Sequence, residues 1–351
     1  MSKKKIAMQL PALAKQIAVE QRYSLELESL ADVAEIVEVD GSSPEAFLEG
    51  ARDADALITS WGIHINRKII IGLEKCSVIG VGSVGVDMVD VDAATEAGIV
   101  VTNVPDVFIE EVADHTMMLL LACARRIKLM DNIVREGEWY KGRPMLEQIP
   151  RLWGQTLGLV SFGNVATAVA RRARPFGLHV IAYDPYVSEL KMTAEGVEPV
   201  SSLRELVERS DFLSVHPGLN DTSRAMISDE EFAAMKNTAS IINCGRGPTI
   251  DEAAMIRALQ NGEIAAAGLD VLEQEPPDLN NPLLYMDNVV LTPHAASATD
   301  RMRPETRRRV GREVRLVLDG KWPMSCVNPS VLPRVKLERW QPYPMSRGPN
   351  R

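Results

Sequence analysis

Residues 158–184 limit the possible folds of this chain more than any other stretch. An apolar run ends there in a turn of small residues, a helical pattern follows, and a second apolar run ends in an acid. This order is typical of a βαβ unit that binds a dinucleotide. The turn, at 161–166, keeps the middle glycine of the G-x-G-x-x-G/A pattern and its final Ala166, but Ser161 replaces the first glycine. The sequence therefore predicts a turn that still binds NAD, with an affinity that is weakened or altered by Ser161.

Apolar runs and helical patterns alternate regularly from residue 156 onward. Six runs read as strands, at 157–161, 179–183, 212–215, 239–243, 265–269 and 288–292. This alternation predicts a six-stranded, doubly wound parallel sheet. The N-terminal part has five further candidates, at 5–10, 33–39, 56–59, 76–81 and 99–102. Helical stretches separate them, so this part is predicted to be α/β as well.

Residues 106–129 read as one helix that follows Pro105 and has Asp106 as its N-cap. Its middle is apolar nearly all round, which requires burial. A core helix and a helix that connects two domains and packs in a dimer both meet this requirement. A last, arginine-rich helix is predicted at 305–319. The proline-rich stretch after Pro329 is predicted to be loosely ordered or to pack on a neighbour.

Composition excludes several classes of partner. The formal net charge of −9 argues against a nucleic-acid groove or an anionic membrane surface. The apolar run at 117–124 is too short to span a bilayer. The four cysteines show no C-x-x-C spacing, and histidines and carboxylates show no metal-ligand spacing. We therefore expect reduced thiols, a cytoplasmic protein and no metal.

Polar and ionisable residues follow the predicted strands of the second sheet. Ligands of open parallel sheets bind beyond the carboxyl ends of the strands, so these residues are candidates for an active site. In strand order they are the turn at 161–166, Asp184, His216, the segment 243–247, Asp270 with Glu275 a few residues on, and the segment 292–294.

Asp184 has the position of an acid that holds the adenosine ribose. It lies 23 residues after Ser161, close to the offset of about 20 residues expected for that acid. A carboxylate there repels a 2′-phosphate, so NAD is favoured over NADP. The alternative is a cap or turn former in the sequence YDPY.

Arg246, Glu275 and His294 follow three different strands at one edge of the predicted sheet. Alone, each reads as a surface or structural residue. Together, a guanidinium that holds a carboxylate and a His–Glu pair that moves a proton suit the reduction of a 2-oxoacid by hydride from a nicotinamide. We expect His216 to be a satisfied histidine at the adenine end of the cleft. His64, His115 and His179 have no matching partners and are expected to be structural.

Several longer motifs resemble the D-isomer-specific 2-hydroxyacid dehydrogenase family, and the resemblance runs to about Pro329. They are VGSVGVDMVDVDAATEAGIVVTNVP, EEVADHTMMLLLACARRI, the stretch TLGLVSFGNVATAVARRARPFGLHVIAYDP, MKNTASIINCGRGPTIDEAAMIRAL, GLDVLEQEPP and NVVLTPHAA. The segments PRLWGQTLGLV and YDPYV are similar to the C-terminal-binding-protein-like subgroup.

The resemblance implies a role for each site residue. Arg246, Glu275 and His294 match the catalytic trio of the family, and Asp270 matches the residue that holds the nicotinamide carboxamide. Trp61 stands where phosphoglycerate-type members have a basic residue, which favours a less charged 2-oxoacid. Besides Arg246 and Trp61, the implied substrate contacts are Ser83, Val84 and Gly85. The implied cofactor contacts are Thr116, Phe162, Gly163, Asn164, Val165, Asp184, Pro185, His216, Thr222, Cys244, Gly245 and Asp270.

The resemblance also implies the domain organisation. Residues 1–105 and 297–330 would form a split, flavodoxin-like substrate domain, residues 106–296 an inserted Rossmann domain for NAD, and residues 331–351 a tail. Homodimers are usual in the family, with the 106–129 helix near the interface.

Two functions remain open at this point. The first is an NAD-dependent dehydrogenase that interconverts a 2-oxoacid and a D-2-hydroxyacid, mostly in the reductive direction. The second is an NAD(H)-sensing protein-interaction module, as the resemblance to corepressors allows. The complete trio favours the enzyme.

Overall fold

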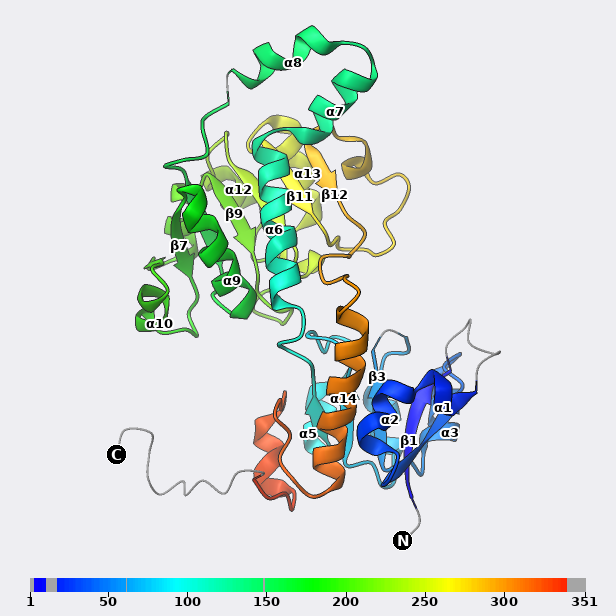
Figure 1. Cartoon of the computed structure of the whole chain (residues 1–351). Helices are drawn as coiled ribbons and strands as arrows, with labels where there is room; N and C mark the ends of the chain where they lie inside the picture. Colours follow the sequence, from blue (N-terminus) through cyan, green and yellow to red (C-terminus); the bar gives the residue numbers. More distant parts are fainter. Residues whose placement is uncertain (1–2, 11–17, 61, 148, 340–351) are drawn as a thin grey trace. The chain divides into compact units, whose positions relative to one another are not determined.

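The computed structural model describes residues 3–10, 18–60, 62–147 and 149–339. The chain divides into two compact units, one formed by residues 1–107 and 299–351 and the other by residues 108–298 (Figure 1). Each unit contains one parallel sheet with helices, which confirms the predicted α/β fold with two doubly wound domains.

The first unit has a five-stranded parallel sheet in the order β2-β1-β3-β4-β5. This is the flavodoxin-like strand order. The strands are β1 (Lys4–Gln9), β2 (Ala34–Val39), β3 (Ala56–Thr59), β4 (Val78–Val81) and β5 (Val100–Thr102). The helices are α1 (Val19–Arg22), α2 (Ser24–Leu30), α3 (Pro44–Ala51), α4 (Arg67–Gly72), α5 (Val91–Glu96) and α14 (Met302–Leu318), with a 3₁₀ helix η4 at Pro329–Arg334.

The arginine-rich helix α14 begins at Met302, three residues before its predicted start. It packs against α2 and β4. A Cβ at Gly80 of β4 would lie 2.6 Å from Val314, so glycine allows this close approach. The arginines pair with carboxylates of the same unit, and Arg307 reaches the buried Glu26 at 2.6 Å. The helix therefore joins the C-terminal segment to the N-terminal one.

The start of the proline-rich segment is ordered, which corrects one of the two alternatives predicted after Pro329, a loosely ordered stretch. The preceding Asn328 is buried, accepts the N–H of Val101 at 2.8 Å and donates to the carbonyl of Ile99 at 3.0 Å. Val331 of η4 is fully buried. The Asn328 side chain, which is bonded to the edge strand β5, therefore anchors this segment. Residues 340–351 of the predicted tail lie outside the described residues.

The second unit has a seven-stranded parallel sheet in the order β12-β11-β10-β9-β6-β7-β8. Six strands match the predicted ones, and the seventh, β8, corrects the predicted count. β8 has only two residues, one of them Pro199, so no apolar run announces it. The strands are β6 (Thr156–Val160), β7 (His179–Tyr183), β8 (Glu198–Pro199), β9 (Phe212–Val215), β10 (Ser240–Asn243), β11 (Ala266–Leu269) and β12 (Val289–Leu291).

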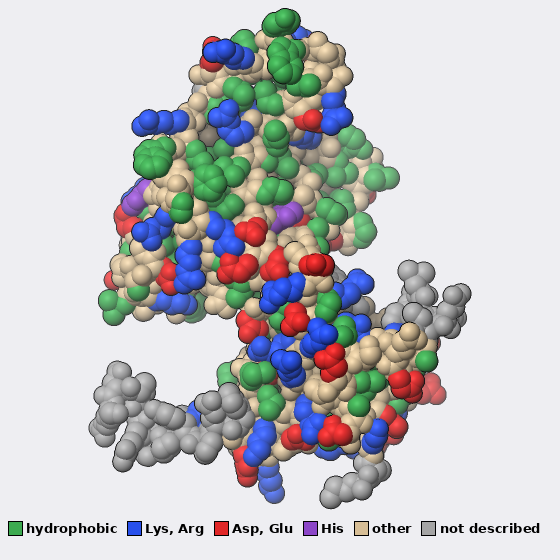
Figure 2. Space-filling model, viewed as in Figure 1, with side chains coloured by type: hydrophobic (Ala, Val, Ile, Leu, Met, Phe, Trp, Pro, Cys, Tyr) green, Lys and Arg blue, Asp and Glu red, His purple; other side chains and the backbone are tan. Residues whose placement is uncertain are grey.

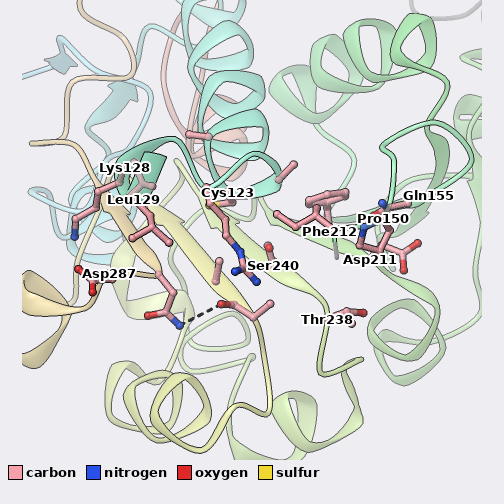
Figure 3. A pocket seen from close by; sticks show the side chains of 18 of the residues that line it. Cys123, Lys128, Leu129, Pro150, Gln155, Asp211, Phe212, Thr238, Ser240 and Asp287 are labelled. Carbon is pink, nitrogen blue, oxygen red and sulfur yellow. Dashed lines mark hydrogen bonds between the residues drawn. The ribbon is translucent and has the colours of Figure 1, made fainter. Parts of the chain in front are cut away.

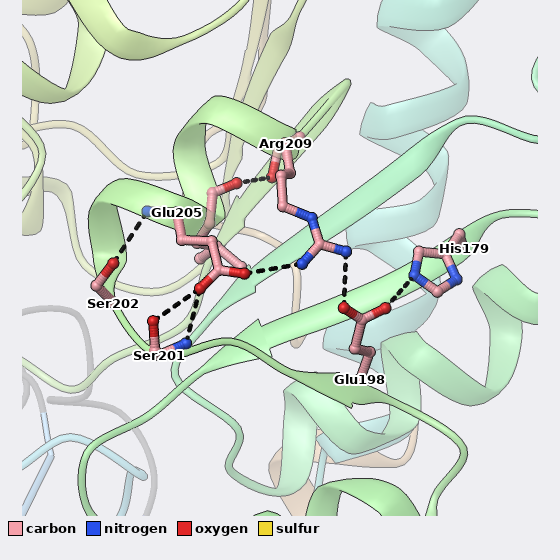
Figure 4. A network of polar contacts seen from close by, with 8 residues as sticks. His179, Glu198, Ser201, Ser202, Glu205 and Arg209 are labelled. Atoms are coloured by element: carbon pink, nitrogen blue, oxygen red, sulfur yellow. Dashed lines mark hydrogen bonds and ion pairs between the residues drawn. The ribbon is translucent and has the colours of Figure 1, made fainter.

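Polar side chains hold the short strand β8 at the sheet edge (Figure 4). Glu198 accepts hydrogen bonds from Arg209 and pairs with His179 of β7, both at 2.7 Å. Arg209 also donates to Glu205 at 2.9 Å, and Glu205 accepts the hydroxyl of Ser201 at 2.8 Å. Arg209 first, and then His179, holds the pKa of Glu198 below its ordinary value. The network is structural and lies on β7, β8 and the helix after β8.

The helix predicted at 106–129 is shorter and is interrupted. It begins at Ile109 without a side-chain cap, so Asp106 is not its N-cap, and it ends at Ala124. Arg126 has a φ of +48°, a left-handed conformation that ends one helix before the next begins. The helices of this unit are α6 (Ile109–Ala124), α7 (Ile127–Arg135), α8 (Trp139–Leu146), α9 (Asn164–Ala173), α10 (Glu189–Ala194), α11 (Leu203–Arg209), α12 (Asp229–Ala234) and α13 (Glu252–Asn261).

Helix α6 is a core helix of the second unit. It contacts β10, β11, β12 and α9, and Figure 1 shows it lying along the sheet. A Cβ at Gly268 of β11 would lie 3.0 Å from Leu119, so the glycine lets the helix approach the strand. Leu119 and Leu120 are fully buried. This packing explains the apolar middle of the helix.

Candidate active site at the carboxyl edge of the second sheet

The turn after β6 presents the N-terminus of α9. Gly163 is the N-cap of this helix, and a Cβ added to it would meet no atom within 4 Å. Gly163 and Asn164 are exposed, whereas Ala166 is fully buried against the core. An open helix N-terminus with free backbone N–H groups suits the pyrophosphate of a dinucleotide.

Ser161 adopts a φ of +69°, the left-handed conformation that a glycine would take without strain. Its hydroxyl donates to Oδ2 of Asp184 at 2.9 Å. The same oxygen accepts the N–H of Phe162 at 2.8 Å, and Oδ1 accepts the N–H of Tyr186 at 2.8 Å. The serine therefore holds the predicted ribose acid, which glycine is unable to do.

A cavity of about 430 Å³ lies beside this turn, where the strand order reverses between β6 and β9. Asp184, Pro185 and Thr222, three predicted cofactor contacts, line it. Tyr183 and Tyr186 also line it and were not predicted. Tyr183 ends β7 and Tyr186 lies two residues after Asp184, so the aromatic residues on both sides of the acid in the sequence YDPY were the signal. The cavity has the place of an adenosine site in a doubly wound sheet.

Three predicted cofactor residues turn their side chains into the protein. Phe162 is fully buried, and its N–H is already bonded to Asp184. His216 contacts Ser214 through Nε2 at 2.9 Å, and burial lowers its pKa to about 4, so it is neutral at physiological pH. Thr116 is fully buried and donates to the carbonyl of Val112 at 2.8 Å. These three side chains therefore support the site from inside the protein and do not project into it.

The loop after β10 carries Arg246. Asn243 is buried and organises this loop, because its Oδ1 accepts the N–H of Gly245 at 2.9 Å and its Nδ2 donates to the carbonyl of Arg246 at 3.0 Å. Sequence reasoning placed Asn243 in the segment but gave it no role. Burial raises the pKa of the neighbouring Cys244 to about 12, so its thiol is a poor nucleophile.

Two loops meet beside Arg246. A Cβ at Gly247 would lie 1.9 Å from the carbonyl oxygen of Leu272, so only glycine fits there. The N–H of Leu272 donates to Oε1 of Glu275 at 3.1 Å. Because of this contact, the loop with Arg246 and the loop with Glu275 are neighbours.

Glu275 and His294 form a pair, with 2.6 Å between Oε2 and Nδ1. Burial acts to raise the pKa of Glu275, but hydrogen bonds from His294 and Leu272 and the charge of Arg246 outweigh it, so the pKa is below its ordinary value. About 28 % of the His294 side chain is exposed. A partly exposed imidazole held by an ionised carboxylate can pass a proton to a bound molecule.

Asp270, after β11, builds the turn that carries His294. The peptide carbonyl of Asp270 accepts the N–H of His294 at 2.8 Å, and its carboxylate accepts the N–H groups of Ala295 and Ala296, both at 2.9 Å. The hydroxyl of Thr292 also donates to the Asp270 carboxylate, with 2.5 Å between Oγ1 and Oδ1. Asp270 was predicted as a cofactor contact, and the structure adds this scaffolding role.

The predicted substrate loop lies in the first unit, after β4. Ser83 donates its hydroxyl to the carbonyl of Gly85 at 2.7 Å, and Asn103 donates to the carbonyl of Val84 at 2.7 Å. Within the described part of the chain, the backbone N–H groups of Ser83, Val84 and Gly85 donate no hydrogen bond. Such free N–H groups suit a carboxylate ligand. Trp61 lies outside the described residues.

A second cavity, of about 450 Å³, lies at the opposite edge of the second sheet (Figure 3). Phe212 and Ser240 line it from the amino ends of β9 and β10, and Cys123 and Lys128 line it from the α6–α7 region. None of the predicted site residues lines it. Across the described ranges, no group of three or more histidine, cysteine or acidic residues is arranged to hold a metal ion. The helices within those ranges include none long and apolar enough to cross a membrane.

An open helix N-terminus and a cavity lined by Asp184 at the switch point are typical of a dinucleotide-binding domain, and the predicted trio follows strands of the same sheet. Residues 117–296 match the family model described as "D-isomer specific 2-hydroxyacid dehydrogenase, NAD binding domain". The chain belongs to the D-isomer-specific 2-hydroxyacid dehydrogenase family. This confirms the predicted family and its nicotinamide cofactor, while the C-terminal-binding-protein-like subgroup stays a prediction.

The chain is similar to relatives that are named for different activities. The chain is 41 % identical over 314 residues to the D-3-phosphoglycerate dehydrogenase of Methanocaldococcus jannaschii, covering 90 % of this chain but 59 % of that protein. It is 40 % identical over 291 residues to the glyoxylate reductase of Korarchaeum cryptofilum, covering 83 % of this chain and 87 % of the relative. The NADPH-dependent glyoxylate/hydroxypyruvate reductase of Sinorhizobium meliloti, solved with NADP and malonate, superimposes with a TM-score of 0.80 at 29 % identity, covering 97 % and 100 % of the two chains.

Proposed function

We propose that this protein reduces a 2-oxoacid to a D-2-hydroxyacid with NADH. The observation that carries the proposal is the 2.6 Å contact between His294 and Glu275, next to the loop of Arg246 and on the same sheet edge as the dinucleotide turn. An acid that is paired with a carboxylate and stands beside a guanidinium has the groups that this reaction needs.

The roles of the side chains follow from their chemistry. NADH, when bound, supplies the hydride that attacks the carbonyl carbon. His294, as an imidazolium, donates its Nε2 proton to the carbonyl oxygen, which becomes the hydroxyl of the product. Glu275 stays ionised and holds the ring through Nδ1. Arg246 binds the substrate through its planar guanidinium, which fits a carboxylate.

We infer that the cofactor is NAD rather than NADP. Asp184 lines the adenosine cavity, and its carboxylate is fixed there by Ser161 and by two backbone N–H groups. A fixed negative charge disfavours the 2′-phosphate of NADP. In this respect we expect a difference from the NADPH-dependent reductase of S. meliloti.

We propose a small 2-oxoacid without a phosphate group, in the range of glyoxylate, as the substrate. The relative at 40 % identity over most of both chains is a glyoxylate reductase. Trp61 stands at the position where the resemblance leads us to expect a basic residue in a phosphoglycerate enzyme.

The experiment is an assay of the purified chain with NADH and a panel of 2-oxoacids that includes glyoxylate, hydroxypyruvate and 3-phosphohydroxypyruvate. We expect NADH oxidation with at least one of them and a loss of about 100-fold or more in kcat in His294→Ala, which removes the proton donor. Binding of NADH without turnover of any 2-oxoacid would overturn the proposal and favour an NAD(H)-sensing module.

We also propose that two copies associate through α7 and α8. These helices expose large apolar side chains, with Trp139 68 % and Tyr140 91 % exposed. Figure 2 shows hydrophobic surface at the end of the second unit that they form. Light scattering should show a dimer that Tyr140→Asp with Trp139→Asp converts to a monomer. Leu279→Asp, at another exposed apolar position of the same unit, should leave the dimer intact.

The free thiols support the predicted cytoplasmic location. All four cysteines, Cys76, Cys123, Cys244 and Cys326, are unpaired. Secreted proteins with several cysteines usually pair them, so we propose that the protein resides in the cytoplasm.

A further inference from the structure

A chain of three polar side chains runs from α6 to the turn that carries His294. Nε2 of His115 lies 2.8 Å from Oγ1 of Thr292, and Oγ1 of Thr292 lies 2.5 Å from Oδ1 of Asp270. Nε2 of His115 is also 3.5 Å from the same carboxylate oxygen. The side chain of Asp270 is 1 % exposed and that of His115 is 18 % exposed, so water has little access to these contacts.

The direction of these hydrogen bonds follows from counting protons. The carboxylate of Asp270 already accepts two backbone N–H groups, so it is the acceptor for the hydroxyl of Thr292. A hydroxyl has one proton to give, and Thr292 gives it to Asp270. Nε2 of His115 must therefore carry a proton and donate it to Thr292. The ring is a donor in this network.

The network ends at the strained turn of the catalytic acid. His294 has a φ of +49°, a conformation that a residue with a side chain rarely adopts. The N–H groups of His294, Ala295 and Ala296 are all bonded to Asp270, through its carbonyl or its carboxylate. Surrounding contacts must hold such a conformation, and here Asp270 supplies them.

We propose that His115 is a positioning residue for catalysis. Its N–H fixes the hydroxyl of Thr292, which fixes the carboxylate of Asp270 and thereby the turn that presents His294 to Glu275. This inference rests on the proposed function and gives a role to a histidine that sequence reasoning considered structural. No local motif reveals it, because His115 and Thr292 are 177 positions apart.

The test compares pairs of substitutions that keep or remove one hydrogen-bonding group. His115→Gln keeps a donor near the Nε2 position and His115→Leu removes it. Thr292→Ser keeps the hydroxyl and Thr292→Val removes it. We expect kcat for 2-oxoacid reduction to fall about tenfold in His115→Leu and Thr292→Val, because a misplaced acid loses alignment, and to stay within about twofold in His115→Gln and Thr292→Ser. His179→Leu, which removes a histidine at the other end of the sheet, should leave kcat unchanged.

Two further measurements separate positioning from a general loss of structure. The double variant His115→Leu/Thr292→Val should be no slower than Thr292→Val alone, because both act through one network. The chain has five histidines, so selective labelling gives few side-chain NMR signals. The His294 signal, identified with His294→Ala, should move in His115→Leu and stay in His115→Gln.

The NMR readout needs no turnover, so it remains decisive if no 2-oxoacid is reduced and the proposed function fails. The inference is overturned if His115→Leu and His115→Gln have the same kcat and the same His294 signal. It is also overturned if the falls in kcat caused by His115→Leu and by Thr292→Val multiply in the double variant. A third contrary outcome is a lower melting temperature in His115→Leu with kcat retained.

Discussion

Two turns of the second unit each hold a non-glycine residue at a positive φ, and they do so with different contacts. Ser161 and His294 both follow a strand, both have a positive φ, and both are held by an aspartate. Asp184 is half-buried and accepts the serine hydroxyl in addition to backbone N–H groups, whereas Asp270 is buried and binds the backbone around the histidine.

The difference shows what the strain serves. At position 161 a glycine would adopt the conformation freely, so the serine adds only its bond to Asp184. At position 294 the imidazole is the proposed proton donor, and a glycine would remove it. If the proposed function holds, strain at the first turn only adjusts cofactor binding, while strain at the second is required to present the proton donor.

The strongest test of this comparison is Asp270→Asn. The amide would place an NH₂ group against backbone N–H groups that need an acceptor, so the turn of His294 should collapse. We expect kcat to fall by about 100-fold or more. Steady-state kinetics with NADH measures this, and circular dichroism checks the fold. A folded variant with kcat within tenfold of the parent would refute the scaffolding role.

Glu275→Gln tests the partner of His294. We expect kcat to fall by about tenfold to 100-fold, since the imidazolium loses its counter-charge. Because the pKa of Glu275 is lowered in the folded protein, its carboxylate stabilises the fold above its unfolded pKa, and this contribution is lost as pH falls through the folded pKa.

Denaturant unfolding at neutral and acidic pH measures that second effect. The difference in stability between the two pH values should be smaller for Glu275→Gln than for the parent. An equal or larger difference would contradict the lowered pKa.

Asp184→Asn tests the first turn. Loss of the charge beside the adenosine cavity should weaken the binding of NADH and allow NADPH to bind. A change of about 1.4 kcal/mol in the difference between their binding free energies shifts the ratio of the two Kd values tenfold. Fluorescence titration measures both constants. Asp229→Asn, which removes an exposed charge paired with Arg257, is the control for net charge. An unchanged ratio in Asp184→Asn would remove the basis for NAD specificity.

Ser161→Gly should have the smallest effect. The glycine removes backbone strain of about 1 kcal/mol and frees Oδ2 of Asp184 for a ribose hydroxyl, so NADH should bind a few-fold more tightly. Ser161→Ala loses the same hydroxyl but keeps the strained φ, so it should be less stable than Ser161→Gly. Weaker NADH binding in Ser161→Gly would show that the hydroxyl contributes more than the strain costs.

The candidate site could be predicted wherever its signal is local. Asp184 follows from an offset of 23 residues, and the trio follows from the ends of strands that apolar runs mark. The end of α6 was missed, because Arg126 and its neighbours continue a helical pattern that one left-handed residue interrupts. The strand β8 was missed because two residues carry no periodicity.

The sequence by itself determined that both parts of the chain are α/β, the order of most of their elements and the residues at the strand ends, because periodicity and short spacings act within a few tens of residues. Only the tertiary structure decided that Ser161 binds Asp184, that Asn328 ties the C-terminal segment to β5, and that His115 reaches the turn of His294. These contacts join residues far apart in the chain or depend on a side-chain direction. Packing fixes both, and no local pattern records either.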